Sequence, residues 1–271
     1  VLVSCTIGCG SCALCDENLY SGCVINTATG PVSNVFGSPL NPGGQTEGVK
    51  VPFADTNLFK IPECLEDEKV LFRTDILPTG YMGADMAAVS PGDAVVVMGC
   101  GPVEVFAQLS TLIRGAATVV AADLDEGRLE KARVRDCRPL NPGKEDLTEV
   151  AKSLTDGRGA DCAIEAVGKP ATVQAALESV RSGEVSVIRV VAGGEQISID
   201  FLPLVMGKSL TIRLGIVNPQ YYIPRLMSMI EQGQLDPTEI ITHRLSLSDG
   251  PRGYEIFDNH EENVLKVVMT P

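Results

Sequence analysis

The 271-residue sequence contains no tryptophan, and aromatic residues make up only 4% of it. A stacking platform for nucleic-acid bases is therefore not expected, since such platforms are built from aromatic side chains. Positive charge is also scarce, because 22 lysines and arginines stand against 35 aspartates and glutamates, for a net charge of −13. A surface of this sign repels nucleic-acid phosphates and anionic lipids. We therefore expect neither nucleic acid nor a membrane as a partner.

Long hydrophobic runs, internal repeats and low-complexity tracts are absent as well. No apolar run approaches the ~20 residues that a helix needs to span a bilayer. Hydrophobic residues nevertheless make up 44% of the chain and charged residues 21%. A chain of this length and composition can bury a substantial core, in one large or two ordinary domains.

Cysteine, by contrast, is plentiful, and four of the nine cysteines lie close together in the sequence. Cys9, Cys12, Cys15 and Cys23 follow the spacing C-x2-C-x2-C-x7-C, which suits four thiolate ligands around one zinc ion. Such a closed set leaves no open coordination position, so the predicted zinc is structural rather than catalytic. The alternatives are two disulfides or four incidental thiols, but incidental thiols rarely fall at zinc spacing.

The remaining five cysteines are dispersed and mostly in apolar settings. They are Cys5, Cys64, Cys100, Cys137 and Cys162. Free thiols of this kind fit a reducing compartment, because secreted proteins usually pair their cysteines. We therefore predict a cytoplasmic protein.

The character of the sequence changes near residue 75. Residues 1–75 are rich in glycine, proline, asparagine and threonine, which predicts a β-rich, loop-rich region. Beyond them the predicted strands span 93–98, 118–122, 161–165 and 185–188, and the predicted helices span 103–114, 126–135 and 171–181. This alternation predicts an α/β fold with a parallel, doubly wound sheet. An amphipathic helix is predicted over 223–232, and mixed strands and turns over 240–268.

A glycine motif follows the first of these strands and opens a helix. Gly99 permits the turn, and Gly101 lets the backbone approach a pyrophosphate at the helix N-terminus. Asp123 ends the next strand, where a carboxylate accepts hydrogen bonds from the adenosine ribose and repels the 2′-phosphate of NADP. Together these features predict an NAD site, the alternative being an ordinary strand–helix turn. Glu104 departs from the motif, because glycine or alanine is expected there and its charge would lie near the phosphates.

The cysteine loop, the β-rich start and the glycine motif occur together with five further segments. These are 44–47 (GQTE), 74–81 (TDILPTGY), 123–129 (DLDEGRL), 159–168 (GADCAIEAVG) and 241–244 (ITHR). In this order they resemble the zinc-dependent medium-chain alcohol dehydrogenases, over essentially the whole chain. Segment 74–81 is most similar to the branch that includes formaldehyde dehydrogenase, although the long insertion of that enzyme after residue 168 is absent.

The resemblance implies a Rossmann-type NAD-binding domain over 81–215 and a truncated, β-rich GroES-like catalytic domain over 1–80, completed by 216–271. It implies reversible hydride transfer between an alcohol or aldehyde and NAD. It also implies a homodimer or homotetramer that associates through an edge strand such as 209–213. The cofactor-binding residues implied are Gly99, Gly101, Pro102, Val103, Asp123, Arg128, Val167 and Gly168.

In this family a catalytic zinc polarises the substrate oxygen and lowers the pKa of the alcohol. The resemblance places Asp75 at the third ligand position, although from the residues alone Asp75 is more simply a helix N-cap. The other two ligands of the family lie upstream of the zinc loop, and only eight residues precede Cys9. His243 and His260 stand in no ligand motif. We therefore expect this chain to lack the catalytic zinc, either as part of a longer enzyme or as a shortened, non-catalytic relative.

A second departure from the family is Arg189, which follows a predicted strand where the family has glycine close to the nicotinamide. A long cation at this position would either obstruct the nicotinamide or pair with a phosphate. Two functions therefore remain open: an NAD-linked dehydrogenase of small alcohols or aldehydes, and a non-catalytic relative that acts as a structural or interaction subunit.

Overall fold

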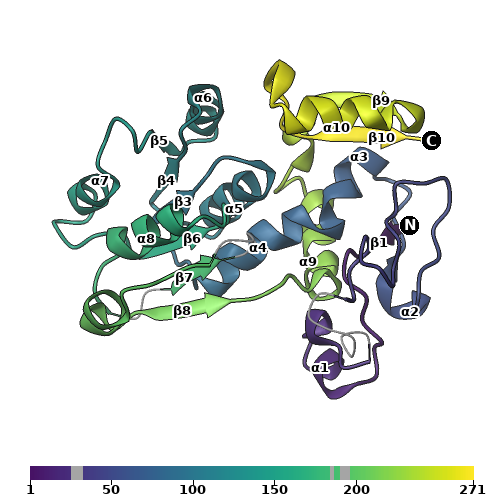
Figure 1. The fold of residues 1–271 in the computed structure, drawn as a ribbon, viewed down its shortest axis with the longest axis horizontal. Coiled ribbons are helices and arrows are strands. Elements are labelled where there is room, and N and C mark those ends of the chain that lie inside the picture. The colour runs from purple at the N-terminus through teal and green to yellow at the C-terminus, as the bar shows by residue number, and fades with distance from the viewer. Residues whose placement is uncertain (26–32, 184–185, 190–195) are drawn as a thin grey trace. The chain divides into compact units, whose positions relative to one another are not determined.

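The computed structural model describes residues 1–25, 33–183, 186–189 and 196–271 (Figure 1). The chain divides into two compact units. The terminal unit comprises Val1–Pro78 together with Val217–Pro271, and the central unit comprises Thr79–Ile216. No helix in the described ranges is both long and apolar enough to cross a membrane.

The central unit is built on a six-stranded parallel sheet in the order β5-β4-β3-β6-β7-β8. The strands are β3 (Ala94–Met98), β4 (Thr118–Ala122), β5 (Arg138–Leu140), β6 (Cys162–Glu165), β7 (Ser186–Arg189) and β8 (Thr211–Leu214). Every residue of β3 is buried, as expected for a strand in the middle of a sheet that is covered on both faces. The predicted α/β fold with a doubly wound parallel sheet is therefore confirmed.

Four α-helices connect the strands from β3 to β7 in chain order, and a short π-helix (Phe201–Met206) precedes β8 (Figure 1). The four α-helices are α5 (Pro102–Ile113), α6 (Glu126–Val134), α7 (Leu147–Ser153) and α8 (Pro170–Ser179). Because strand–helix–strand crossovers are right-handed, α5 and α6 cover one face of the sheet and α7 and α8 cover the other. Proline begins α5 and α8, while the carboxylates of Asp125 and Asp146 cap α6 and α7 by accepting backbone N–H groups.

Most of helix α4 (Ile76–Met86) also belongs to the central unit, and it lies very close to α5. A β-carbon placed on Gly80 would lie 2.6 Å from the backbone nitrogen of Ala107 and 2.7 Å from the β-carbon of Phe106. Any side chain larger than hydrogen would therefore push the two helices apart. This close approach gives a structural reason for glycine in the segment 74–81.

The N-terminal part of the terminal unit contains little strand in its described residues. β1 (Leu2–Val3) and β2 (Leu58–Phe59) pair antiparallel over two residues each. The helices α1 (Ala13–Asp16), α2 (Ala54–Asn57) and α3 (Asp67–Val70) are single turns. The region is therefore poorer in strand than predicted, because the glycines and prolines between residues 42 and 52 interrupt the alternating pattern before a strand forms.

The C-terminal part of the terminal unit is more regular. It contains α9 (Pro219–Glu231), β9 (His243–Ser246), α10 (Gly250–Asp258) and β10 (Val267–Thr270), and β9 pairs parallel with β10. Helix α9 begins four residues before the predicted start at 223, because Pro219 supplies a favourable first position. Helix α10 was predicted as strands and turns, since Gly250 and Gly253 conceal its periodicity.

Candidate zinc loop and cofactor site

The structure brings the four cysteines of the predicted zinc loop together. The sulfur atoms of Cys9, Cys12, Cys15 and Cys23 all lie within 4.8 Å of one another, and three of the residues are buried. All nine cysteines of the chain are free thiols, so the disulfide alternative has no support. Four unpaired sulfurs in so small a volume offer zinc a closed tetrahedral set of ligands.

Hydrogen-bond donors point at these sulfurs. The sulfur of Cys23 accepts the amide of Cys9 at 3.3 Å, and the sulfur of Cys9 accepts the amide of Ser11 at 3.4 Å. Burial opposes ionisation of Cys9, but the hydrogen bonds that its sulfur accepts from the amide and hydroxyl of Ser11 and from neighbouring thiols prevail and lower its pKa to about 6. Burial raises the pKa of Cys15, whose sulfur is 3.9 Å from that of Cys9, to about 12. The loop is thus prepared to hold thiolate charge at Cys9, which is the form that binds metal.

A buried polar network anchors this loop within the terminal unit. The Oδ1 atom of Asn57 accepts the amide of Gly8 at 3.0 Å and Nε2 of Gln220 at 2.8 Å. Its Nδ2 atom donates to the carbonyl of Gly8 at 2.9 Å, and Nε2 of Gln220 also donates to the carbonyl of Thr6 at 2.7 Å. Fully paired buried amides of this kind fix a single geometry. Gly10 completes the loop at φ +74°, a conformation that favours glycine.

A cavity of about 250 Å³ opens at the carboxyl ends of β3, β4 and β6 in the central unit. The strand order reverses between β3 and β6, which is where doubly wound folds bind ligands. Five predicted cofactor residues line the cavity: Gly99, Gly101, Asp123, Arg128 and Val167.

The other three predicted cofactor residues are described by the structure but do not line this cavity. Pro102 begins helix α5, and Val103 is partly buried in its first turn. The amide of Gly168 donates to the buried carboxylate of Glu165 at 2.8 Å. These residues therefore shape the turns around the cavity.

Asp123 is held in place by two backbone amides. Its Oδ2 atom accepts the amide of Cys100 in the glycine loop at 2.7 Å, and its Oδ1 atom accepts the amide of Asp125 at 2.9 Å. Each carboxylate oxygen keeps a further lone pair for a ligand hydroxyl. The carboxylate is therefore fixed beside the glycine loop with acceptor capacity to spare.

Two polar residues of the cavity, Lys169 and Thr172, were missed by the sequence analysis. Both lie at the start of α8, and Oγ1 of Thr172 donates to Glu165 at 2.7 Å. The signal for them was present, because Pro170 marks a helix start directly after a predicted strand and its turn. The side chain of Arg189, at the end of β7, lies outside the described part of the structure.

Asp75 is exposed and lies directly before α4. It accepts a hydrogen bond from the thiol of Cys5, and burial together with this carboxylate raises the pKa of Cys5 well above its usual value. Within the described ranges, the zinc loop alone brings three or more metal donors together, so no such group includes Asp75. His243 is partly buried and hydrogen-bonds to Thr242, whereas His260 is exposed.

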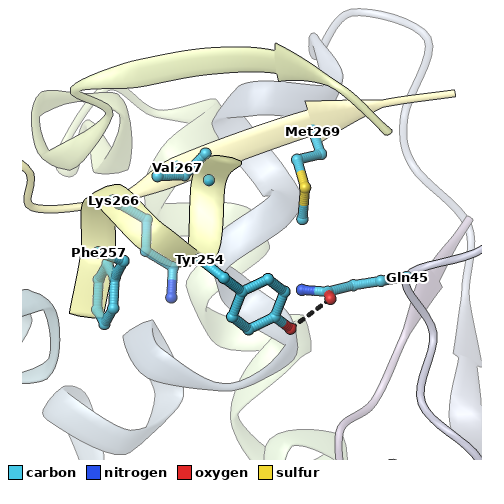
Figure 2. A pocket seen from close by; sticks show the side chains of 7 residues that line it. Gln45, Tyr254, Phe257, Lys266, Val267 and Met269 are labelled. Atoms are coloured by element: carbon cyan, nitrogen blue, oxygen red, sulfur yellow. Dashed lines mark hydrogen bonds between the residues drawn. The ribbon is translucent and has the colours of Figure 1, made fainter. Parts of the chain in front are cut away.

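A second cavity, of about 240 Å³, lies within the terminal unit (Figure 2). Tyr254 and Phe257 of α10 line it, together with Gln45, Gly253, Lys266, Val267 and Met269. The hydroxyl of Tyr254 donates to Gln45 at 2.5 Å (Figure 2). Lys266 is the one charged residue among the described residues that line it, and burial lowers its pKa, against the attraction of Asp75. This cavity was not predicted from the sequence, because residues 250–258 were expected to form strands and turns rather than α10.

Residues 102–232 match the zinc-binding dehydrogenase family. The chain is 34% identical to the uncharacterized zinc-type alcohol dehydrogenase-like protein AdhB of Bacillus subtilis, over 100% of this chain and 79% of that protein. It is 31% identical to the glutathione-independent formaldehyde dehydrogenase of Pseudomonas aeruginosa, over 95% of this chain and 73% of that protein. The solved structure of alcohol dehydrogenase TADH from Thermus sp. ATN1 matches with a TM-score of 0.90 and 35% identity, over 99% of this chain and 76% of that one. The chain therefore belongs to the zinc-dependent alcohol dehydrogenase family of oxidoreductases.

Proposed function

We propose that the protein transfers a hydride between a small alcohol or aldehyde and NAD. The cavity of the central unit is the observation that carries this proposal, because it joins a glycine turn, a helix N-terminus and a fixed carboxylate. Gly101 is the N-cap of α5, so the positive end of the helix dipole favours a pyrophosphate beside the loop. The proposed NAD-binding domain comprises residues 81–215, and residues 1–80 and 216–271 form the GroES-like part.

Asp123 supports NAD rather than NADP as the cofactor. Its two oxygens are oriented by the amides of Cys100 and Asp125 and can accept the ribose hydroxyls. The 2′-phosphate of NADP would meet this carboxylate, and like charges repel. Arg128 and Val167 line the same cavity and complete the proposed contact surface.

We also propose that Cys9, Cys12, Cys15 and Cys23 hold one structural zinc ion. The four sulfurs fit this role, since they lie within 4.8 Å of one another and are free thiols. A closed set of four ligands leaves no position for substrate, so the ion stabilises the loop without taking part in the reaction. The free thiols also support the predicted cytoplasmic location.

The described residues do not fit a catalytic zinc. Such sites need three protein ligands, and Asp75 is not part of any group of three donors in the described ranges. We therefore expect this chain by itself to oxidise alcohols negligibly, even with NAD and added zinc. The same observation favours a second candidate function, a non-catalytic relative that serves as a structural or interaction subunit.

An assay that combines binding with turnover separates these functions. NAD is titrated into the purified protein by calorimetry, and NADH absorbance is followed with short alcohols and formaldehyde. Binding without turnover is the expected result for this chain under both candidates. Turnover by a longer form that supplies the other two zinc ligands, lost again in its Asp75→Ala variant, supports the dehydrogenase, whereas a longer form that binds NAD without turnover supports the non-catalytic candidate. Binding with turnover supports the dehydrogenase and contradicts the argument from the missing ligands. Absence of NAD binding contradicts both the dehydrogenase and the proposed cofactor site.

A further inference from the structure

Glu104 occupies the space that the glycine loop leaves open for a phosphate. It lies in the first turn of α5 and is only 8% exposed. A β-carbon placed on Gly101 would lie 2.7 Å from Oε2 of Glu104, and one placed on Gly99 would lie 3.1 Å from Oε1. In this motif the missing side chain of the second glycine lets the backbone approach the pyrophosphate. In this protein the carboxyl group of Glu104 lies in the space beside the second glycine.

The charged groups around Glu104 do not neutralise it. Burial raises the pKa of Glu104 to about 7; its own backbone amide opposes this shift, and the charges of Asp123 and Glu165 add to it. Arg128 acts in the opposite direction, with a smaller effect. The neighbouring Cys100 stays neutral, because burial raises the pKa of its thiol to about 12.

Among the residues that the structure describes, Lys169 is the remaining charged residue that lines the same cavity. It lies at the N-cap of α8, beyond the glycine loop, and Glu104 forms no ion pair with it or with any other cation in the described ranges. The carboxylate of Glu104 is thus buried without a salt-bridge partner, beside the helix N-terminus that attracts anions.

We propose that Glu104 competes with the pyrophosphate of NAD for the glycine loop, so that cofactor binding takes up a proton at Glu104. This inference rests on the proposed NAD site. Two negative groups cannot share the loop without strong repulsion, whereas a neutral carboxylic acid can remain beside the pyrophosphate or move aside. Glu104 is therefore an affinity-determining residue that links cofactor binding to pH.

The sign of the effect follows from linkage. Binding favours the protonated acid, so NAD binds more tightly as the pH falls through the pKa of Glu104 and more weakly as the pH rises above it. With a pKa of about 7, the neutral fraction falls from about 0.9 at pH 6 to about 0.09 at pH 8. The dissociation constant for NAD should therefore rise about tenfold between these pH values.

Calorimetric titration with NAD at pH 6, 7 and 8 tests this inference on the wild-type protein and on two variants. Glu104→Gln keeps the size of the side chain and removes its charge, while Glu104→Gly restores the residue that the motif expects. Both variants should bind NAD with little change between pH 6 and pH 8, and Glu104→Gly should bind most tightly. Buffers of different ionisation enthalpy should show uptake of nearly one proton by the wild-type protein at pH 8 and none by Glu104→Gln.

The outcomes separate this inference from the proposed function. If Glu104→Gly binds NAD and the wild-type affinity is as flat with pH as that of Glu104→Gln, the inference is wrong and the NAD site stands. A pH dependence that persists in Glu104→Gln belongs to another group and also contradicts it. If none of the three proteins binds NAD at any pH, the proposed function fails and the inference fails with it. Thermal unfolding of both variants checks that they fold.

Discussion

The two units of the chain are stabilised in different ways. The central unit rests on a parallel sheet whose middle strand β3 is buried at every residue. The described strands at the N-terminal end of the terminal unit have only two residues each, and its interior includes the hydrogen-bonded amides of Asn57 and Gln220. Hydrophobic burial accounts for the first unit. The second also buries apolar side chains, such as Ile223 and Leu226 of α9, but it depends in addition on satisfied polar groups and, we infer, on a metal ion.

Removal of the proposed zinc should cause the largest difference in stability between the two units. Structural zinc contributes on the order of 10 kcal/mol to small metal-dependent domains, and most of that stability should be lost when one ligand is removed. In Cys12→Ser, we expect zinc content to fall from about one per chain to near zero and the terminal unit to unfold first. Elemental analysis and calorimetric unfolding measure these changes, with the exposed Cys64→Ser as the matched control. Zinc content retained by Cys12→Ser would rule out the proposed ligand set.

Replacement of the buried Arg73 in the terminal unit should give the next largest change in stability. Arg73 is fully buried; in the described ranges its Nε and Nη2 atoms have no hydrogen-bond partner, while Nη1 donates to the sulfur of Met227. Burial lowers the pKa of Arg73 to about 10. The charge of Glu231 opposes this shift, but Arg73 forms no ion pair in the described ranges. A buried charge of this kind is costly, so Arg73→Met should stabilise the protein by about 2 kcal/mol. Denaturant unfolding tests this, and a less stable Arg73→Met would show that the guanidinium is well accommodated.

The exposed Arg133 is a suitable control for that substitution. Its guanidinium is 66% exposed and pairs with Glu130 on the surface of α6, in the central unit. Surface ion pairs contribute about 0–1 kcal/mol, so Arg133→Met should change stability little.

Self-association through the edge strand of the central unit should give a smaller effect than the changes in the terminal unit. Strand β8 is at the edge of the sheet, and Phe201, Leu202 and Leu214 are more than half exposed. Exposed strand edges and apolar side chains tend to be covered by a partner, which supports the predicted homodimer or homotetramer. Light scattering should show at least a dimer at micromolar concentration, and Leu214→Lys should weaken it. The matched control is Val134→Lys, which is also exposed. A clean wild-type monomer would refute the prediction.

The difference between the central and the terminal unit also explains how much of the fold was predictable from the sequence. Strand β4 was predicted at its observed bounds, because a buried parallel strand reads as a continuous apolar run. Strand β5 was missed, since it has three residues and includes Pro139, which an edge strand tolerates. Regular burial leaves a strong local pattern, whereas short edge elements and glycine-containing helices do not.

The candidate sites divide in a similar way. The placement of the four cysteines at one point, and of Gly99 and Asp123 at one cavity, was predictable because it follows from their spacing and from the strands they end. The pairing of Asn57 with Gln220 joins segments far apart in the sequence, so no local pattern indicates it. The space filled by Glu104 follows from the side-chain direction in the first turn of α5, which the sequence alone does not give.

The central claim is that the central unit is an NAD site in which Asp123 selects the cofactor. Calorimetric titration of NAD and NADP at pH 6, into the wild-type protein and into Asp123→Ser, tests it most directly. We predict that the wild-type protein binds NAD at least tenfold more tightly than NADP, because the carboxylate accepts ribose hydroxyls and repels a 2′-phosphate. Asp123→Ser should lose most of this preference. Equal or tighter binding of NADP by the wild-type protein would contradict the claim.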